Sequence, residues 1–222
     1  MRPPRLDARL QRIADCMPVC QIAADIGTDH GKLTAWLLWH NRCQRMIASD
    51  ISETSRAKAH ALFNRLGLSD RVVISGDDGL LALTEPVQAI VISGMGGGNI
   101  AGMLAQNIDL NDAELIISAH TEHADLREAL MQRRYRIYHE YVVKSGGRLY
   151  LVCHAKPGNM RLSGRERALG VNLTATKTAS PIDYLRWQLS VASTWRDEAS
   201  EQFRAWIREI IDDEETNNTD HL

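Results

Sequence analysis

The feature that most constrains the fold of this chain is a regular alternation between short apolar runs and longer stretches with helical periodicity. Five runs have the length and composition of buried strands, and a turn follows each of them. They are Gln21–Ile26, Arg45–Asp50, Arg71–Ser75, Val87–Ser93 and Ala113–Ser118. Strands that alternate with helices in this way predict a parallel sheet with helices on both of its faces.

Helix-period residues fill the stretches between these runs, and one stretch carries signals at both ends. Ser52 stands in the N-cap position and Gly67 in the C-cap position of the stretch Ser52–Leu66. The other predicted helices are Lys32–Trp39, Asn99–Ala105 and Ala124–Arg134.

The periodicity changes after residue 134. Tyr135–Lys144 and Arg148–Ala155 are strand-like runs joined by Ser145-Gly146-Gly147. A short glycine-containing link of this kind predicts a β-hairpin. We therefore predict an α/β fold for residues 1–156, with a sheet of five parallel strands and a terminal antiparallel hairpin.

Residues 157–222 are predicted to form a linker and a small helical extension. Glycine and proline recur through Lys156–Ser180, which is typical of a connecting segment. Beyond it, apolar residues from Leu185 to Ile210 recur at helical spacing, so one or two amphipathic helices are expected.

A glycine-containing segment, Asp25-Ile26-Gly27-Thr28-Asp29-His30-Gly31, lies between the first predicted strand and the first predicted helix. Glycines at such a turn let the backbone approach a ligand closely. The D-x-G-x-x-x-G frame resembles the first motif of S-adenosylmethionine (SAM) methyltransferases, with Asp29 in place of the middle glycine. The carboxylate of Asp25 suits the ammonium group of the methionine moiety, directly or through water. The residues assigned to the cofactor here are Asp25, Gly27, Thr28, Asp29, His30 and Gly31.

The main alternative ligand is a nicotinamide or flavin dinucleotide, which needs a G-x-G-x-x-G frame and a helix N-terminus that holds the pyrophosphate. The glycines of this segment do not fit that frame, and Asp29 would place a negative charge beside the pyrophosphate. At an effective dielectric constant of about 20, unit charges ~4 Å apart interact by ~4 kcal/mol. An acidic loop therefore favours a cationic sulfonium cofactor.

Acidic residues also follow the second and third predicted strands. Asp50 can accept hydrogen bonds from ribose hydroxyls, a role common to SAM and dinucleotide folds. Asp77 or Asp78 can accept one from the adenine amino group. Each acid alone is more simply a turn residue, but together with the glycines they predict a nucleoside-type ligand at the carboxyl ends of the strands. We assign Asp50, Ile51, Asp77, Asp78 and Gly79 to this ligand.

The fourth predicted strand is followed by Ser93-Gly94-Met95-Gly96-Gly97-Gly98. Methyltransferases often place the methyl acceptor beside this point. Many amino-methylating enzymes carry Asn/Asp-Pro-Pro-Tyr/Phe here, and this chain does not. The glycine run permits close backbone approach, although a simple strand-to-helix turn would also explain it. Gly94 and Met95 complete the predicted cofactor site.

The distribution of charge indicates where an anionic partner would bind. The net charge is only −2, but residues 127–167 carry ten Lys or Arg against three Asp or Glu. The first twelve residues carry four arginines against one aspartate. These segments predict either an anion-binding face or ordinary solvated helix faces. The candidate phosphate ligands are Arg5, Arg9, Arg127, Arg133 and Arg134.

Several classes of protein are excluded by composition and length. No apolar run approaches the ~20 residues of a membrane-spanning helix, and the first residues lack the apolar core of a secretory signal, which favours the cytoplasm. Four cysteines are too few and too scattered for a disulfide scaffold. The pairs Cys16/Cys20 and His120/His123 lack a second pair at zinc spacing, so we expect no metal. We also expect a monomer.

Three segments taken in order resemble the bacterial tRNA (adenine-22-N1)-methyltransferases: Asp25–His30, Asp77–Leu80 and Ile92–Gly97. Arg5–Asp15, Leu126–Glu140 and Gly146–Tyr150 are also similar, so the resemblance covers about residues 5 to 190. It implies a Rossmann-like class I methyltransferase domain with a helical C-terminal extension, SAM as cofactor and tRNA as substrate. The implied product is methylated at N1 of adenine. We assign Asp29 as the catalytic carboxylate that stabilises the cationic product or accepts its proton.

Two departures from the family pattern lie on the acceptor side. Where the family reads D-H-A-Y-L-P, this chain has Lys32 in place of the aromatic residue. Where the family reads Q-P-N, this chain has Ser118-Ala119-His120. Two alternatives therefore remain open. One is a SAM-dependent methyltransferase of another RNA base or of a small molecule, and the other is a SAM- and tRNA-binding protein with little turnover.

Overall fold

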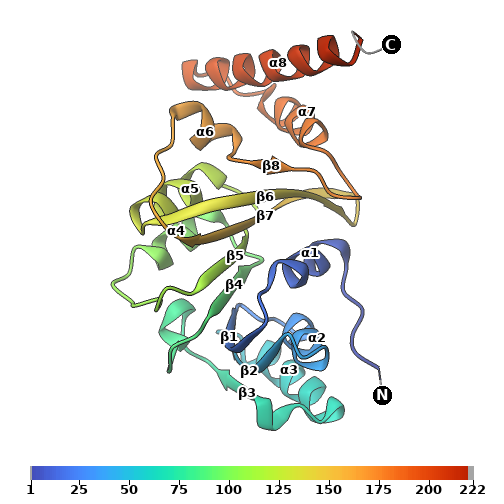
Figure 1. The fold of residues 1–222 in the computed structure, drawn as a ribbon, viewed down its shortest axis with the longest axis vertical. Helices are drawn as coiled ribbons and strands as arrows, with labels where there is room; N and C mark the ends of the chain where they lie inside the picture. The colour runs from blue at the N-terminus through green and yellow to red at the C-terminus, as the bar shows by residue number, and fades with distance from the viewer. Residues whose placement is uncertain (1, 220–222) are drawn as a thin grey trace.

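The computed structural model describes residues 2–219, and within them eight strands form one sheet (Figure 1). The strands lie in the order β3-β2-β1-β4-β5-β7-β6-β8. Their bounds are β1 (Cys20–Ile26), β2 (Cys43–Ser49), β3 (Val72–Ser75), β4 (Ala89–Ser93), β5 (Glu114–Ser118), β6 (Tyr135–Ser145), β7 (Arg148–Pro157) and β8 (Leu173–Thr174).

Strand directions confirm the predicted parallel sheet and its terminal hairpin. Every neighbouring pair among β1 to β5 is parallel. Strand β7 inserts between β5 and β6 and runs antiparallel to both. The tip of the β6–β7 hairpin therefore lies at the carboxyl ends of the parallel strands. Tyr135, which pairs with Pro157, lies at the other end of the hairpin, on the side of the amino ends of those strands.

Helices cover both faces of the sheet. One face carries α1 (Ala8–Cys16), α2 (Lys32–Trp39), α3 (Glu53–Leu66) and the short 3-10 turn η1 (Ser69–Arg71), and the other carries η2 (Gly79–Ala82), α4 (Gly97–Leu104) and α5 (His123–Gln132) (Figure 1). Both predicted caps of α3 are confirmed. The Ser52 hydroxyl accepts a hydrogen bond from the N–H of Ser55, and Gly67 adopts a left-handed conformation.

The core consists of two apolar layers, one on each side of the central strands. Ala23 and Val91 face the layer under α1, α2 and α3, and Ala24 and Ile90 face the layer under α4 and α5. All four side chains are fully buried. Burial on both faces explains why these runs are almost continuously apolar.

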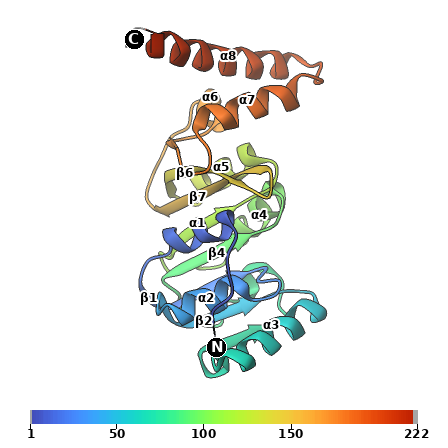
Figure 2. The same ribbon diagram turned by 90° about the vertical axis from the view of Figure 1, so that its right-hand side faces the viewer.

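The C-terminal extension consists of α6 (Gly164–Leu169), α7 (Pro181–Ala192) and α8 (Glu198–Thr219), which stack beyond the β8 edge of the sheet (Figure 2). Leu169, Leu185 and Ile207 form the centre of its apolar core. The last three residues of the predicted extension, 220–222, lie outside the described residues. None of the described helices is long and apolar enough to cross a membrane.

The prediction of a plain linker over Lys156–Ser180 was wrong, because α6 and β8 lie within it and β8 pairs with β6. A buried ion pair fixes this segment to the main sheet. Nε of Arg127 donates to Glu140 at 2.9 Å, and its Nη1 donates to the carbonyl of Arg167. Glu140 also accepts from the N–H of Val171. Whether the chain divides at residue 156 stays a prediction.

Candidate functional site

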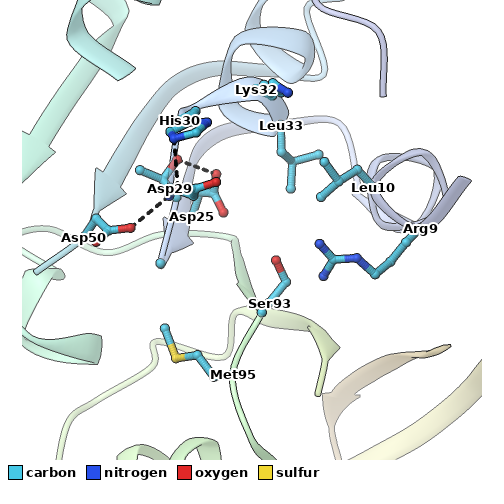
Figure 3. A pocket seen from close by; sticks show the side chains of 13 residues that line it. Arg9, Leu10, Asp25, Asp29, His30, Lys32, Leu33, Asp50, Ser93 and Met95 are labelled. Carbon is cyan, nitrogen blue, oxygen red and sulfur yellow. Dashed lines mark hydrogen bonds and ion pairs between the residues drawn. The ribbon is translucent and has the colours of Figure 1, made fainter. Parts of the chain in front are cut away.

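Two adjoining cavities lie at the carboxyl ends of β1, β2, β3 and β4. One, of about 310 Å³, is lined by residues of α1, of the β1–α2 turn and of the β4 end (Figure 3). The other, of about 580 Å³, extends over the β2, β3 and α4 ends. They share Gly27, Asp50 and Met95. Their sizes are typical of small-molecule sites, and their shared boundary suits one ligand that spans both.

Of the thirteen residues predicted to bind the cofactor, twelve line these cavities. The first cavity takes the predicted residues Asp25, Gly27, Thr28, Asp29, His30, Asp50, Gly94 and Met95. The second adds Ile51, Asp77, Asp78 and Gly79. Gly31 lines neither cavity. It adopts a left-handed conformation at the start of α2, where a Cβ atom would lie 2.6 Å from Cζ of Phe63. Its role is therefore in packing.

The β1–α2 turn brings backbone close to the cavity because it has no side chain at Gly27. The φ angle of Gly27 is +76°, and a Cβ atom there would lie 2.6 Å from Cε of Met95. Asp29 also has a positive φ, of +52°. Asparagine and aspartate tolerate this region better than most residues, so the aspartate fits a position that the methyltransferase motif usually gives to glycine.

Asp25 is a buried carboxyl at the end of β1, with only 2% of its surface exposed. Its Oδ2 accepts hydrogen bonds from the hydroxyls of Thr28 and Thr34, both at 2.7 Å. Burial raises the pKa of Asp25 above its usual value, and the two hydroxyls oppose that shift. A buried carboxylate of this kind favours a cationic partner in the cavity.

Asp50 organises the turn as well as lining the site. Its Oδ2 accepts the backbone N–H of Asp29 and its Oδ1 accepts that of Ser52, both at 2.9 Å. Each carboxylate oxygen has two lone pairs, so ribose hydroxyls can still be accepted. Beside it, Asp77 accepts a hydrogen bond from the Ser75 hydroxyl at 2.7 Å.

The side chain of Asp29 lies at the mouth of the first cavity and is 70% exposed. Its Oδ1 is 3.4 Å from Nε2 of His30 and 3.4 Å from the Ser55 hydroxyl. Figure 3 shows it next to Asp25 and across the cavity from Arg9. The carboxylate thus lines the mouth of the cleft, and its catalytic role stays a prediction.

Sequence reasoning named Arg9 and His120 separately but missed that Tyr150 brings them together beside the cleft. The guanidinium of Arg9 lies 5.4 Å from the centre of the Tyr150 ring, and the His120 ring lies 5.9 Å from the same ring. Burial lowers the pKa of His120, and the charges of Arg9 and Arg148 lower it further. The hairpin motif Gly146–Tyr150 indicated this position, but only its topology brings it to the cleft.

The structure corrects one of the predicted phosphate ligands, Arg127, and places two others, Arg133 and Arg134, away from the cleft. Arg127 is 1% exposed and forms the buried ion pair with Glu140, so it cannot reach a phosphate. Arg133 donates to the carbonyl of Ile108 at 2.6 Å, which directs its charge to the α4–β5 connection. Arg134 directly precedes β6, on the side of the amino ends of the parallel strands, and the cleft lies at their carboxyl ends. Arg5 is exposed ahead of α1, and Arg9 lines the first cavity.

The residues present fit a SAM-type cofactor. The second cavity offers acids for the ribose and the adenine amino group, and the first offers the buried Asp25 for an ammonium group. The open backbone at Gly27 joins the two. One polar atom of a residue that lines the first cavity, Nη1 of Arg9, is buried and has no hydrogen-bond partner in the protein. Buried donors are nearly always paired in folded proteins, so this atom indicates a missing acceptor.

Comparisons with known proteins agree with this geometry. A methyltransferase-domain family matches residues 6–153. The Bacillus subtilis (strain 168) tRNA (adenine(22)-N(1))-methyltransferase is 30% identical over 185 residues, which are 82% of this chain and 76% of that protein.

Solved structures share the fold along almost the whole chain. The M. capricolum TrmK structure in complex with S-adenosyl-homocysteine superposes with a TM-score of 0.80 at 21% identity, over 93% of this chain and 98% of that one. A Streptococcus agalactiae protein of the NADB-Rossmann superfamily gives a TM-score of 0.79 at 25% identity, over 95% and 96%. These matches confirm the Rossmann-like class and the resemblance seen in the sequence: the chain belongs to the tRNA (adenine-22-N1)-methyltransferase family.

Proposed function

We propose that this protein transfers a methyl group from SAM to N1 of adenine 22 in tRNA. The observation that carries the proposal is the pair of joined cavities at the strand ends, lined by Asp25, Asp50 and the Asp77–Asp78 pair, in a chain of this family. The acids suit a cofactor with two positive centres and one adenosine group. A small-molecule acceptor would not need the exposed Lys32 on the wall of the first cavity or the exposed Arg148 near His120.

The protein contributes mainly alignment. When bound, SAM would supply a methyl group on a sulfonium ion: the N1 lone pair of adenine attacks the methyl carbon in line, the C–S bond breaks, and S-adenosylhomocysteine leaves with the bonding electron pair. Asp50 and the Asp77–Asp78 pair would hold the adenosine end, and Asp25 would hold the ammonium group. Gly27 has no side chain where the two cavities join, so the backbone of the turn can lie close to the bound cofactor. Holding both reactants in this geometry supplies most of the rate enhancement that such a reaction needs.

The acceptor base approaches over Gly94, between Asp29 on one side and His120 on the other. The imidazole of His120 faces this point, since its Nε2 lies 3.9 Å from where a Cβ of Gly94 would be. N1 must leave its stack or pair, at a cost of a few kcal/mol. The methylated base is cationic, and the Asp29 carboxylate stabilises that charge or accepts the amino proton. Neutral His120 can accept a hydrogen bond from the same amino group.

The direct test uses tritiated SAM and two sets of unmodified tRNA transcripts, identical except for adenine or guanine at tRNA position 22. We expect label in the adenine set alone. Label in both sets would keep methyl transfer but move the target base. No label in either set, with SAM binding intact, would favour the binding-protein alternative or a different acceptor. We further infer that the protein acts as a monomer, in the cytoplasm and without a metal ion.

A further inference from the structure

We propose that Arg9 of α1 binds the carboxylate of the cofactor's methionine moiety, and that Tyr150 positions it to do so. The proposal rests on SAM as the cofactor and goes beyond it, because it assigns a binding partner to the one end of the ligand that the acidic residues cannot hold. It also replaces the expectation that Arg9 contacts a tRNA phosphate.

The position of Arg9 is the first step. The side chain reaches from α1 into the first cavity, which it lines together with Asp25 and Ser93. Figure 3 shows its guanidinium directed toward Ser93, on the opposite wall from the carboxylates of Asp25 and Asp29. Nη1 is buried and has no hydrogen-bond partner in the protein. A buried charged donor without an acceptor is costly, so the cavity is complete only when an acceptor lies there.

The charges around the cavity decide what that acceptor is. Asp25, Asp29 and Asp50 attract the ammonium and sulfonium groups, and they repel a carboxylate. The methionine moiety carries both an ammonium and a carboxylate on one carbon atom. Lys32 also lines this cavity, but its side chain is exposed on α2. Arg9 is therefore the cation best placed to neutralise the carboxylate in a partly desolvated position, and its planar fork matches two carboxylate oxygens.

The connection between the two cavities separates a cofactor carboxylate from a tRNA phosphate. The cavity that contains Arg9 shares Gly27, Asp50 and Met95 with the nucleoside cavity. A ligand that fills both must have an adenosine end and a short zwitterionic tail. Tyr150 holds the guanidinium in place, because its ring centre lies 5.4 Å from Cζ of Arg9. Such a cation–π contact fixes the direction of the fork.

The test compares two ligands that differ only in the amino-acid tail. Isothermal titration calorimetry would measure the Kd of S-adenosylhomocysteine and of 5′-methylthioadenosine, which lacks that tail, for the wild type and for Arg9→Met. We expect Arg9→Met to weaken S-adenosylhomocysteine about 10- to 100-fold and to leave 5′-methylthioadenosine unchanged. The matched control is Arg12→Met, since Arg12 is on the same helix, lies over the ring of Tyr141 and does not line the cavity. It should change neither Kd.

Two results would overturn the proposal. An unchanged Kd for S-adenosylhomocysteine in Arg9→Met would show that Arg9 does not hold the carboxylate. Equal losses for both ligands would show that Arg9 only shapes the cavity. Circular dichroism would check folding, and Arg9→Gln, which keeps a polar side chain, provides the same comparison if the Met variant does not fold. Because no tRNA is present, a failure here is distinct from a failure of tRNA methylation.

Discussion

The carboxylate of Asp50 accepts the backbone N–H of Asp29 at 2.9 Å, across 21 residues of sequence. This hydrogen bond joins the ends of β2 and β1, and it fixes the turn in which Asp29 has a positive φ angle. The other oxygen of Asp50 accepts the N–H of Ser52 at the start of α3. One side chain therefore shapes the cofactor loop and lines both cavities.

Replacement of Asp50 should show this double role. We expect Asp50→Ala to weaken S-adenosylhomocysteine at least about 10-fold, because hydrogen bonds to a charged acceptor are lost from ligand and loop together. Calorimetry measures the Kd, and Asp70→Ala, at an exposed acid outside the cleft, is the control. Wild-type affinity in Asp50→Ala would contradict the assignment of the ribose to Asp50.

The order of the elements could be predicted from the sequence because local signals agree with the tertiary structure. The helix Lys32–Trp39 is predicted with its observed bounds, and the caps Ser52 and Gly67 are confirmed. The segment that contains α6 and β8 could not be predicted, since its order depends on long-range contacts. The buried Arg127–Glu140 pair holds it to the sheet, and no local periodicity reports such a contact.

The cofactor side of the site was more predictable than the acceptor side for a physical reason. Asp25 lies at the end of β1, Asp50 and Asp77 follow β2 and β3, and parallel strands bring their carboxyl ends together. Counting charges along the sequence could not predict which arginines lie near the cleft, because β6 and β7 run from the amino-end side of the sheet to the carboxyl-end side. Arg134 thus lies far along the strand direction from Arg148, although both belong to one basic stretch.

The charge of Asp25 should favour cofactor binding and lower the stability of the fold. In Asp25→Asn, the Thr28 and Thr34 hydroxyls can still donate to the amide oxygen, while the desolvated charge is removed. We expect the variant to lose most of its SAM affinity and to be at least as stable as the wild type at pH 7. Calorimetry and urea unfolding measure the two effects.

The pH dependence of this difference has a definite sign. The native pKa of Asp25 lies above its usual 3.8, so between the two values the folded state holds a proton that the unfolded state has lost. The stability of the wild type relative to Asp25→Asn should therefore fall as the pH rises through that window. A relative stability that rises instead would contradict the assignment.

Asp29 should act on turnover more than on binding. Asparagine tolerates the same positive φ angle, so Asp29→Asn should keep the turn and the Kd for S-adenosylhomocysteine. We expect the rate constant of methyl transfer to tRNA to fall about 100-fold, within the range typical of a lost acid–base group. Single-turnover assays with saturating SAM measure it. Methylation at the wild-type rate would remove Asp29 from the catalytic step.

His123 should make the fold sensitive to mild acid. Burial lowers its pKa from 6.5 to about 4, and the nearby charge of Arg127 adds to that shift. As the pH falls, His123 is protonated in the unfolded chain before it is protonated in the folded protein, which favours unfolding. The stability that depends on neutral His123 is therefore fully present above pH 6.5 and is lost as the pH falls toward 4. Between pH 7 and pH 5 the loss amounts to about 2 kcal/mol. Urea unfolding at the two pH values should show a smaller loss in His123→Gln, and an equal loss in both proteins would contradict this.

The hairpin tip should bind tRNA, and the opposite sheet edge should not. Arg148 is exposed at the start of β7, beside His120 and the mouth of the cleft, whereas Arg134 is exposed at the other edge. A phosphate contact releases counterions, so its loss lowers both affinity and salt dependence. We expect Arg148→Gln to weaken tRNA binding and to reduce the slope of log K against log salt by about 1. Arg134→Gln, which removes the same charge, should leave the slope unchanged. Filter binding from 50 to 200 mM salt would measure these slopes, because phosphate contacts change the affinity strongly over that range. Equal slopes in the two variants would refute a tRNA site at the cleft mouth.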